Sequence, residues 1–113
     1  MENKKLILLI DDERDFLELF RFILENSNFR VITADSPAEG LAKAQQNPDL
    51  ILLDLNMPGM SGHEVCKQLK ENSNSTHIPI VMLTSQDKTL DKIEAFNLGI
   101  VDYIGKQFPT EEI

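Results

Sequence analysis

Several polar residues that could carry out chemistry stand directly after short apolar segments of the chain. Taken singly, each has an ordinary structural explanation: an aspartate can cap a following helix, a threonine can end a strand, and a lysine can lie at the surface. Taken together, they supply carboxylates, hydroxyls and an ammonium group. They are Asp11 and Asp12 after residues 6–10, Asp54 after residues 50–53, Thr84 and Ser85 after residues 78–83, and Lys106 after residues 100–104.

The carboxylates indicate a site for a hard cation if the fold brings them together. Clustered carboxylates repel one another unless a cation lies among them. A site with few protein ligands, all of them oxygen, suits Mg²⁺, which keeps several waters and readily binds phosphate oxygens. Asp54 in addition closes an apolar segment, where a carboxylate must be solvated or paired. The cofactor that these residues predict is therefore Mg²⁺.

Phosphoryl transfer is the chemistry that such a set of groups fits. It requires a nucleophile, a metal ion that neutralises charge, and donors for the phosphoryl oxygens. Asp54 can serve as the nucleophile, and Asp11 and Asp12 can hold the metal ion. Lys106 and Thr84 can then donate to the phosphoryl oxygens.

The apolar segments before these residues have the pattern of strands in a parallel sheet. Residues 6–10, 50–53 and 78–83 are continuously apolar apart from one proline, which is typical of strands buried on both faces. Residues 29–34 and 100–104 are shorter or mixed with polar residues. We therefore expect three inner strands and two edge strands.

Amphipathic segments lie between the predicted strands and indicate helices. Alternation of strand and helix predicts a doubly wound α/β domain, in which ligand sites lie outside the carboxyl ends of the strands. The predicted helices are residues 13–26, with Phe16, Phe20, Ile23 and Leu24 on one stripe; residues 37–46, after Ser36; a helix after Ser61, with Val65, Cys66 and Leu69 as its apolar face; and residues 87–98, ended by Gly99.

Length and charge narrow the class of protein. The 113 residues fit one domain, and we predict a single domain over residues 1–113. The formal net charge of −8 opposes binding to phosphate backbones, so we expect no direct nucleic-acid binding by this segment. No apolar run is long enough to span a membrane and no targeting segment is visible, which favours a cytoplasmic location.

The cysteine and the two histidines are predicted to be structural. A single cysteine cannot form an internal disulfide, and the helical surroundings of Cys66 indicate packing. His63 and His77 have no further cysteine or histidine nearby, so we expect no zinc site. Both histidines are predicted to lie at the surface.

Four segments resemble the receiver domains of response regulators, the switch proteins of bacterial two-component systems. The resemblance covers nearly the whole chain and implies a flavodoxin-like sheet of five parallel strands in the order 2-1-3-4-5. The segments are LILLIDDE at residues 6–13, LILLDLNMPGMSG at residues 50–62, IPIVMLTS at residues 78–85 and GIVDYIGK at residues 99–106.

The resemblance also implies a phosphorylation switch. Asp54 would accept a phosphoryl group from the phosphohistidine of a sensor histidine kinase or phosphotransfer protein. Asp12 would bind Mg²⁺ directly, and Asp11 directly or through water. The backbone carbonyl of Asn56 would be a further ligand. The domain would assist its own phosphorylation and dephosphorylation without being a conventional turnover enzyme.

Further roles follow from the same resemblance. Thr84 would move to the new phosphoryl oxygen while Tyr103 turns inward behind it, which would remodel the face around them. The side chains of Asn56 and Gln86 would tune the lifetime of the acyl phosphate. Pro58, Gly59 and Gly62 fit the loop after Asp54, where glycines allow positive φ angles, and Ser61 can cap the next helix.

Two features depart from the family pattern. Lys106 is followed by Gln107, where the family usually has a proline in a cis peptide bond. Because a cis bond without proline costs about 2.5–4 kcal/mol, we expect a trans loop, which weakens the prediction that Lys106 reaches the phosphoryl group. Residues 109–113 have the pattern of a first helical turn, so the fifth helix is expected to be truncated, as in a fragment of a longer protein, with apolar surface exposed beside the first helix.

Two alternative functions remain open. A docking module with the same fold, independent of phosphate, is favoured by Gln107 and the truncated end, and it would not bind Mg²⁺. A phosphohydrolase of the haloacid dehalogenase type combines similar groups, but the order of the motifs and the lack of a segment that encloses a substrate count against it. The sequence does not identify the kinase, the output domain or downstream protein, and it leaves a homodimer open.

Overall fold

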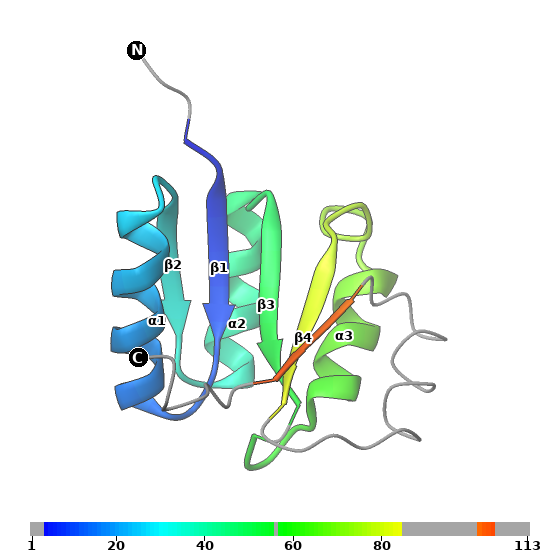
Figure 1. The fold of residues 1–113 in the computed structure, drawn as a ribbon. Coiled ribbons are helices and arrows are strands. Elements are labelled where there is room, and N and C mark those ends of the chain that lie inside the picture. Colours follow the sequence, from blue (N-terminus) through cyan, green and yellow to red (C-terminus); the bar gives the residue numbers. More distant parts are fainter. Residues whose placement is uncertain (1–3, 56, 85–101, 106–113) are drawn as a thin grey trace.

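Five parallel strands form one sheet in the order that the resemblance to receiver domains implies. The computed structural model describes residues 4–55, 57–84 and 102–105. Hydrogen-bonded neighbours follow the order β2-β1-β3-β4-β5, and every neighbouring pair is parallel. The doubly wound α/β fold is thereby confirmed. The strands are β1 (Leu6–Ile10), β2 (Arg30–Ala34), β3 (Leu50–Asp54), β4 (Ile80–Thr84) and β5 (Asp102–Gly105), shown in Figure 1.

Helices cover both faces of this sheet. The helix α1 (Arg14–Asn26) packs on one face, and α2 (Pro37–Lys43) and α3 (Gly62–Glu71) pack on the other (Figure 1). A short 3₁₀ helix (Ala44–Gln46) continues α2. The left-handed backbone of Asn47, with φ of 58°, ends this segment. The predicted helix over residues 37–46 is therefore correct in extent but changes its winding after Lys43.

Side chains of the inner strands alternate between two separate hydrophobic clusters. In β1, Leu8 and Ile10 belong to the cluster beneath α2 and α3, whereas Ile7 and Leu9 belong to the cluster beneath α1. Full burial of an aliphatic side chain of this size contributes roughly 1.5–3 kcal/mol. Because both faces of the sheet are covered, the inner strands are continuously apolar, as the sequence analysis assumed.

The apolar stripe of α1 differs from the prediction at two positions. Leu17, which was not predicted to belong to it, is 5% exposed and lies in the core, whereas Ile23 is 40% exposed. The other predicted members, Phe16, Phe20 and Leu24, pack against the core. The rings of Phe16 and Phe20 stack with centroids 5.2 Å apart. Helical periodicity predicts that α1 has an apolar stripe, but packing against the sheet determines which residues lie at the centre of that stripe.

The outer side of α1 carries apolar side chains that face solvent. Leu19 is 52% exposed and Phe22 is 65% exposed. Among the described helices, none is both long and apolar enough to cross a membrane. The helix predicted over residues 87–98 and the helical turn predicted over residues 109–113 lie outside the described residues.

Serine caps begin α2 and α3 as predicted, and of the two glycines beside Ser61 the first, Gly59, has a positive φ angle whereas Gly62 does not. The Oγ atoms of Ser36 and Ser61 each accept a hydrogen bond of 3.2 Å from the backbone N–H three residues later. Gly59 has a φ of 89°, in the left-handed region. Gly62 instead has the backbone of an ordinary first helical residue, and its lack of a side chain matters for a different reason given below.

The cysteine packs as predicted, and the histidines differ from each other. Cys66 is fully buried on α3, and this burial raises the pKa of its thiol. His77 is exposed, with its Nε2 atom 3.1 Å from Oδ1 of Asn47. The ring of His63 is partly buried, and its Nε2 atom lies below the surface with no hydrogen-bond partner among the described residues. The prediction of a surface position is therefore wrong for the Nε2 edge of His63.

A candidate metal and phosphoryl-transfer site

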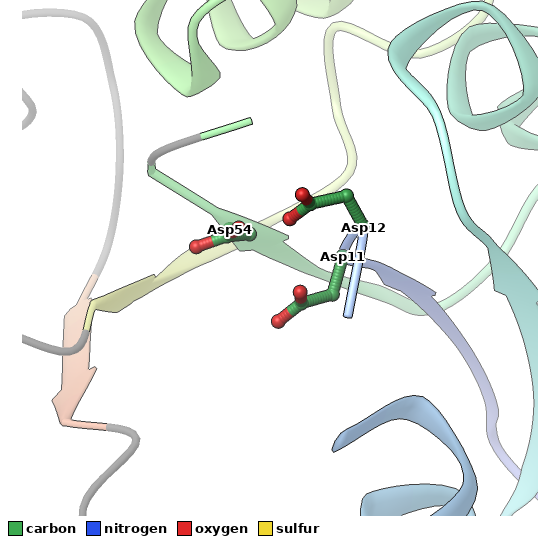
Figure 2. A group of neighbouring side chains, drawn as sticks. All are labelled: Asp11, Asp12 and Asp54. Atoms are coloured by element: carbon green, nitrogen blue, oxygen red, sulfur yellow. The ribbon is translucent and has the colours of Figure 1, made fainter. Parts of the chain in front are cut away.

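Three carboxylates gather at the carboxyl ends of two neighbouring strands. Asp11 and Asp12 directly follow β1, and Asp54 is the last residue of β3, which pairs with β1. One ligand oxygen from each carboxylate lies within 4.8 Å of the corresponding oxygens of the other two. Figure 2 shows the side chains side by side at this edge of the sheet. The structure thus brings together the carboxylates that the sequence predicted as a metal site.

The three carboxylates differ in burial. Asp11 is 0% exposed and Asp54 is 3% exposed, whereas Asp12 is intermediate. Oδ1 of Asp11 accepts a hydrogen bond of 2.9 Å from the backbone N–H of Glu13, and the N–H of Asp11 donates to the carbonyl of Ala34 at 3.0 Å. Asp11 therefore holds the turn into α1, and this structural role is compatible with the predicted role as a metal ligand.

The donor set fits a small divalent cation. All ligand atoms are carboxylate oxygens, which hard cations such as Mg²⁺ prefer. Oxygens on opposite sides of a bound Mg²⁺ would be about 4.2 Å apart, given a metal–oxygen distance near 2.1 Å. Oxygens in adjacent positions would be closer still, at about 3.0 Å, so these carboxylate oxygens, which lie within 4.8 Å of one another, would have to move closer together to bind one cation. A cation would also relieve the repulsion among three clustered negative charges.

The backbone of β4 and β5 carries further predicted residues to the same edge. Asp54 pairs with Leu83, and the next residue, Thr84, pairs with Gly105. Thr84 therefore lies at the carboxyl end of the strand beside Asp54. Tyr103 lies within β5. The switch roles of Thr84 and Tyr103 stay predictions.

Five residues that the sequence analysis singled out lie outside the described part of the chain. They are Asn56, Ser85, Gln86, Lys106 and Gln107. The metal-ligand role of Asn56, the tuning role of Asn56 and Gln86, the donor role of Lys106 and the trans peptide after Lys106 all stay predictions.

Backbone hydrogen bonds close the loop between β3 and α3. The N–H of Leu55 donates to the carbonyl of Leu83 at 2.9 Å, and the N–H of Gly62 donates to the carbonyl of Leu55 at 2.9 Å. Gly62 also touches the backbone of Asp54, a contact that sequence reasoning missed. The sequence did contain a signal for a close contact. A glycine just after a serine cap begins a helix and needs no unusual backbone conformation, so the remaining reason for glycine is the close approach of another part of the chain.

Fold and site together define a doubly wound α/β domain with a cluster of three carboxylates at the carboxyl edge of its sheet. The chain belongs to the response regulator receiver domain family, whose model matches residues 7–113. It is thus a receiver domain of the kind found in the response regulators of two-component systems, as its sequence motifs indicate.

Individual known proteins agree with this assignment. The chain is 44% identical over 112 residues to the alkaline phosphatase synthesis transcriptional regulatory protein PhoP of Bacillus subtilis, covering 98% of this chain and 45% of PhoP. The chain therefore spans about half the length of such curated relatives. The chemotaxis protein CheY4 of Vibrio cholerae has a TM-score of 0.89 at 32% identity, covering 96% of this chain and 92% of that one. The Mn²⁺-bound form of response regulator Rcp1 has a TM-score of 0.83 at 31% identity, covering 96% of this chain and 85% of that one.

Proposed function

We propose that Asp54 accepts a phosphoryl group and that Asp11, Asp12 and Asp54 hold Mg²⁺ for this transfer, with the backbone carbonyl of Asn56 as a further ligand. One observation carries the proposal: in a receiver domain, three carboxylates lie within 4.8 Å of one another at the carboxyl edge of the sheet. The similar structure of Rcp1 is described as an Mn²⁺-bound form, which supports a divalent cation at such a site. The donor would be the phosphohistidine of a sensor histidine kinase or phosphotransfer protein.

The transfer exchanges one bond to phosphorus for another. A carboxylate oxygen of Asp54 attacks the phosphorus atom, and the new P–O bond forms as the P–N bond to the donor histidine breaks. The leaving imidazole keeps the electron pair of that bond and takes up a proton. Bound Mg²⁺ supplies neutralisation of the charge on the phosphoryl oxygens. Thr84 and Lys106 would donate to those oxygens.

The product is a mixed acyl phosphate on Asp54, and water returns it to aspartate and inorganic phosphate. Each phosphorylation occupies the site until this hydrolysis, so the domain acts as a switch rather than as a conventional turnover enzyme. The side chains of Asn56 and Gln86 would set how long the phosphorylated state lasts. Thr84 and Tyr103 would convert that state into a change of the surrounding surface.

The phosphorylated surface would act on an output domain or a separate protein. The relative PhoP is named a transcriptional regulatory protein, and the present chain spans 45% of its length. We therefore propose transcriptional regulation as the output. The net charge of −8 argues that DNA contacts would come from another part of the protein.

A small phosphodonor tests the proposal without the kinase. Acetyl phosphate with Mg²⁺ should add one phosphoryl group to the wild-type chain, measured as intact mass, with acetate as the leaving group. Asp54→Ala should gain none. Asp49→Ala is the matched control, because Asp49 precedes β3 at the other edge of the sheet and accepts a hydrogen bond from the N–H of Leu6. A wild-type chain that gains no mass, or an Asp54→Ala variant that gains as much, would overturn the proposal.

A further inference from the structure

The strand that carries Asp54 and the helix that follows it meet without any side chain between them. A Cβ atom placed on Gly62, the first residue of α3, would lie 2.5 Å from the backbone oxygen of Asp54. It would also lie 2.8 Å from Cα and 3.0 Å from the backbone oxygen of Leu55. Such distances are well inside ordinary van der Waals contact, so any side chain at position 62 forces backbone to move.

The strand side of this contact has little room to retreat. Asp54 is 3% exposed and pairs with Leu83 in β4. The next residue, Leu55, is also buried, and its N–H donates to the carbonyl of Leu83 at 2.9 Å. Displacement of the strand end would strain these hydrogen bonds and carry the Asp54 carboxylate with it.

The start of α3, on the other side of this contact, is also held firmly in place. One face of α3 packs into the core through Val65, Cys66 and Leu69, each at most 1% exposed. The N–H of Gly62 donates to the carbonyl of Leu55 at 2.9 Å, which ties the first turn of the helix to the strand end. Close-packed interiors transmit a displacement rather than absorb it. The missing side chain at position 62 therefore fixes how closely the strand end and the helix approach.

We propose that Gly62 is a positioning residue, which sets the place of the Asp54 carboxylate relative to Asp11 and Asp12. This inference rests on the proposed role of Asp54. The three ligand oxygens lie within 4.8 Å of one another, so a shift of the β3 end changes both the metal site and the line of attack. A displacement of about 1 Å at a reacting group can cost roughly 100-fold in rate.

Two further glycines, Gly59 and Gly40, provide matched controls, because an alanine side chain meets different obstacles at each. At Gly59, in the same loop, a Cβ atom would meet nothing within 4 Å, and the cost is backbone strain at a φ of 89°. At Gly40, in α2, it would lie 2.7 Å from Cδ1, 3.0 Å from Cγ2 and 3.1 Å from Cγ1 of Ile10, which are side-chain rather than backbone atoms. Both substitutions should lower stability, and neither pushes on the backbone of Asp54.

The experiment compares phosphorylation rates of Gly62→Ala, Gly59→Ala and Gly40→Ala with the wild type. Initial rates are measured against acetyl phosphate and Mg²⁺ concentration, at a temperature at which circular dichroism shows each variant to be folded. Gly62→Ala should lose roughly tenfold or more in maximal rate and need more Mg²⁺ for half its maximum. The two control variants should keep nearly the wild-type rate despite their lower melting temperatures.

A folded Gly62→Ala variant with the wild-type rate and Mg²⁺ requirement would overturn the inference. If the variant is unfolded, the comparison is repeated in the cold with sucrose, which favours the folded state. Failure to fold even there would count against a positioning role, because the glycine would then serve the fold as a whole. If the wild type itself is not phosphorylated, or Asp54→Ala is, the proposed function fails rather than the role of Gly62.

Discussion

The carboxylates at the carboxyl edge of the sheet place negative charge where little water reaches it. Asp11 and Asp54 are almost fully buried, and Asp12 is half-buried. Burial of charge and repulsion between like charges both oppose folding in the absence of a cation. Asp11 also accepts a hydrogen bond from the N–H of Glu13, so its removal would disturb the turn into α1. Asp12 is therefore the carboxylate whose removal best isolates the effect of charge.

Asp12→Ala should raise the melting temperature of the metal-free protein and weaken its binding of Mg²⁺. The first effect follows from relief of repulsion, and the second from the loss of a ligand. Thermal melts in a chelator and Mg²⁺ titrations measure the two effects. Asp49→Ala removes the same charge but also an acceptor for the N–H of Leu6, so it should lower the melting temperature. A clear decrease for Asp12→Ala in the chelator would contradict a repulsive cluster.

At the scale of elements, the start of α3 links the acceptor strand to the core. Ser61 caps this helix, because its Oγ accepts a hydrogen bond of 3.2 Å from the N–H of Glu64. The loop after the helix is held as well. The Oγ of Ser75 donates to the carbonyl of Leu69 at 2.7 Å, and the serine is 1% exposed. Both ends of α3 are thus fixed by serine side chains.

Ser61→Ala should lower the free energy of unfolding by about 1 kcal/mol, because the cap acceptor for the N–H of Glu64 is lost. Ser61→Thr keeps a hydroxyl at the same position and should recover most of this loss. Urea denaturation measures both variants. Equal stability of Ser61→Ala and the wild type would show that the hydrogen bond seen in the structure adds nothing to the helix start.

Local sequence patterns were sufficient to predict those elements whose burial or capping depends on their own residues. Residues 6–10 and 50–53 are apolar throughout because both faces of their strands are covered, so their type could be predicted without knowledge of their neighbours. Ser36 and Ser61 were predicted as caps because capping depends only on the next few residues. The Asp cluster was predictable because parallel strands bring their carboxyl ends to one edge.

Features that depend on tertiary contacts could not be predicted in this way. The exposure of Ile23 and the burial of Leu17 depend on how α1 is rotated against the sheet. Ser75 lies in a segment with the composition of a polar loop. It is nevertheless buried, and its Oγ donates a hydrogen bond to the carbonyl of Leu69 near the end of α3. The position of Gly62 just after a serine cap indicates a close approach, but only the structure shows that the approach is to the backbone of Asp54.

At the scale of the whole molecule, the fold brings the candidate site residues to one edge of the sheet. Sheet order brings β1 and β3 together at the centre, and β4 and β5 extend the same edge. Under the proposed function, this edge is the site of a phosphorylation switch. The alternative is a docking module that is independent of phosphate, and it would have the same fold. It would differ from the switch because its native state would not bind Mg²⁺.

Mg²⁺ should raise the melting temperature of the whole domain in a saturable way. A ligand that binds only the native state stabilises it by about 2.7 kcal/mol when present at 100 times its Kd. Melts in millimolar Mg²⁺, against NaCl of equal ionic strength, measure this stabilisation. Asp12→Ala should show a much smaller increase. Absence of any increase in the wild type would favour the docking module.

The most direct test of the central claim locates the phosphoryl group on the chain. Borohydride reduces an acyl phosphate of aspartate to homoserine, so the modified residue can be identified by peptide sequencing after treatment with acetyl phosphate and Mg²⁺. We predict homoserine at position 54 and at no other aspartate, and none when Mg²⁺ is chelated. Homoserine at position 11 or 12, or at none of the three, would contradict the assignment of Asp54 as the phosphoryl acceptor.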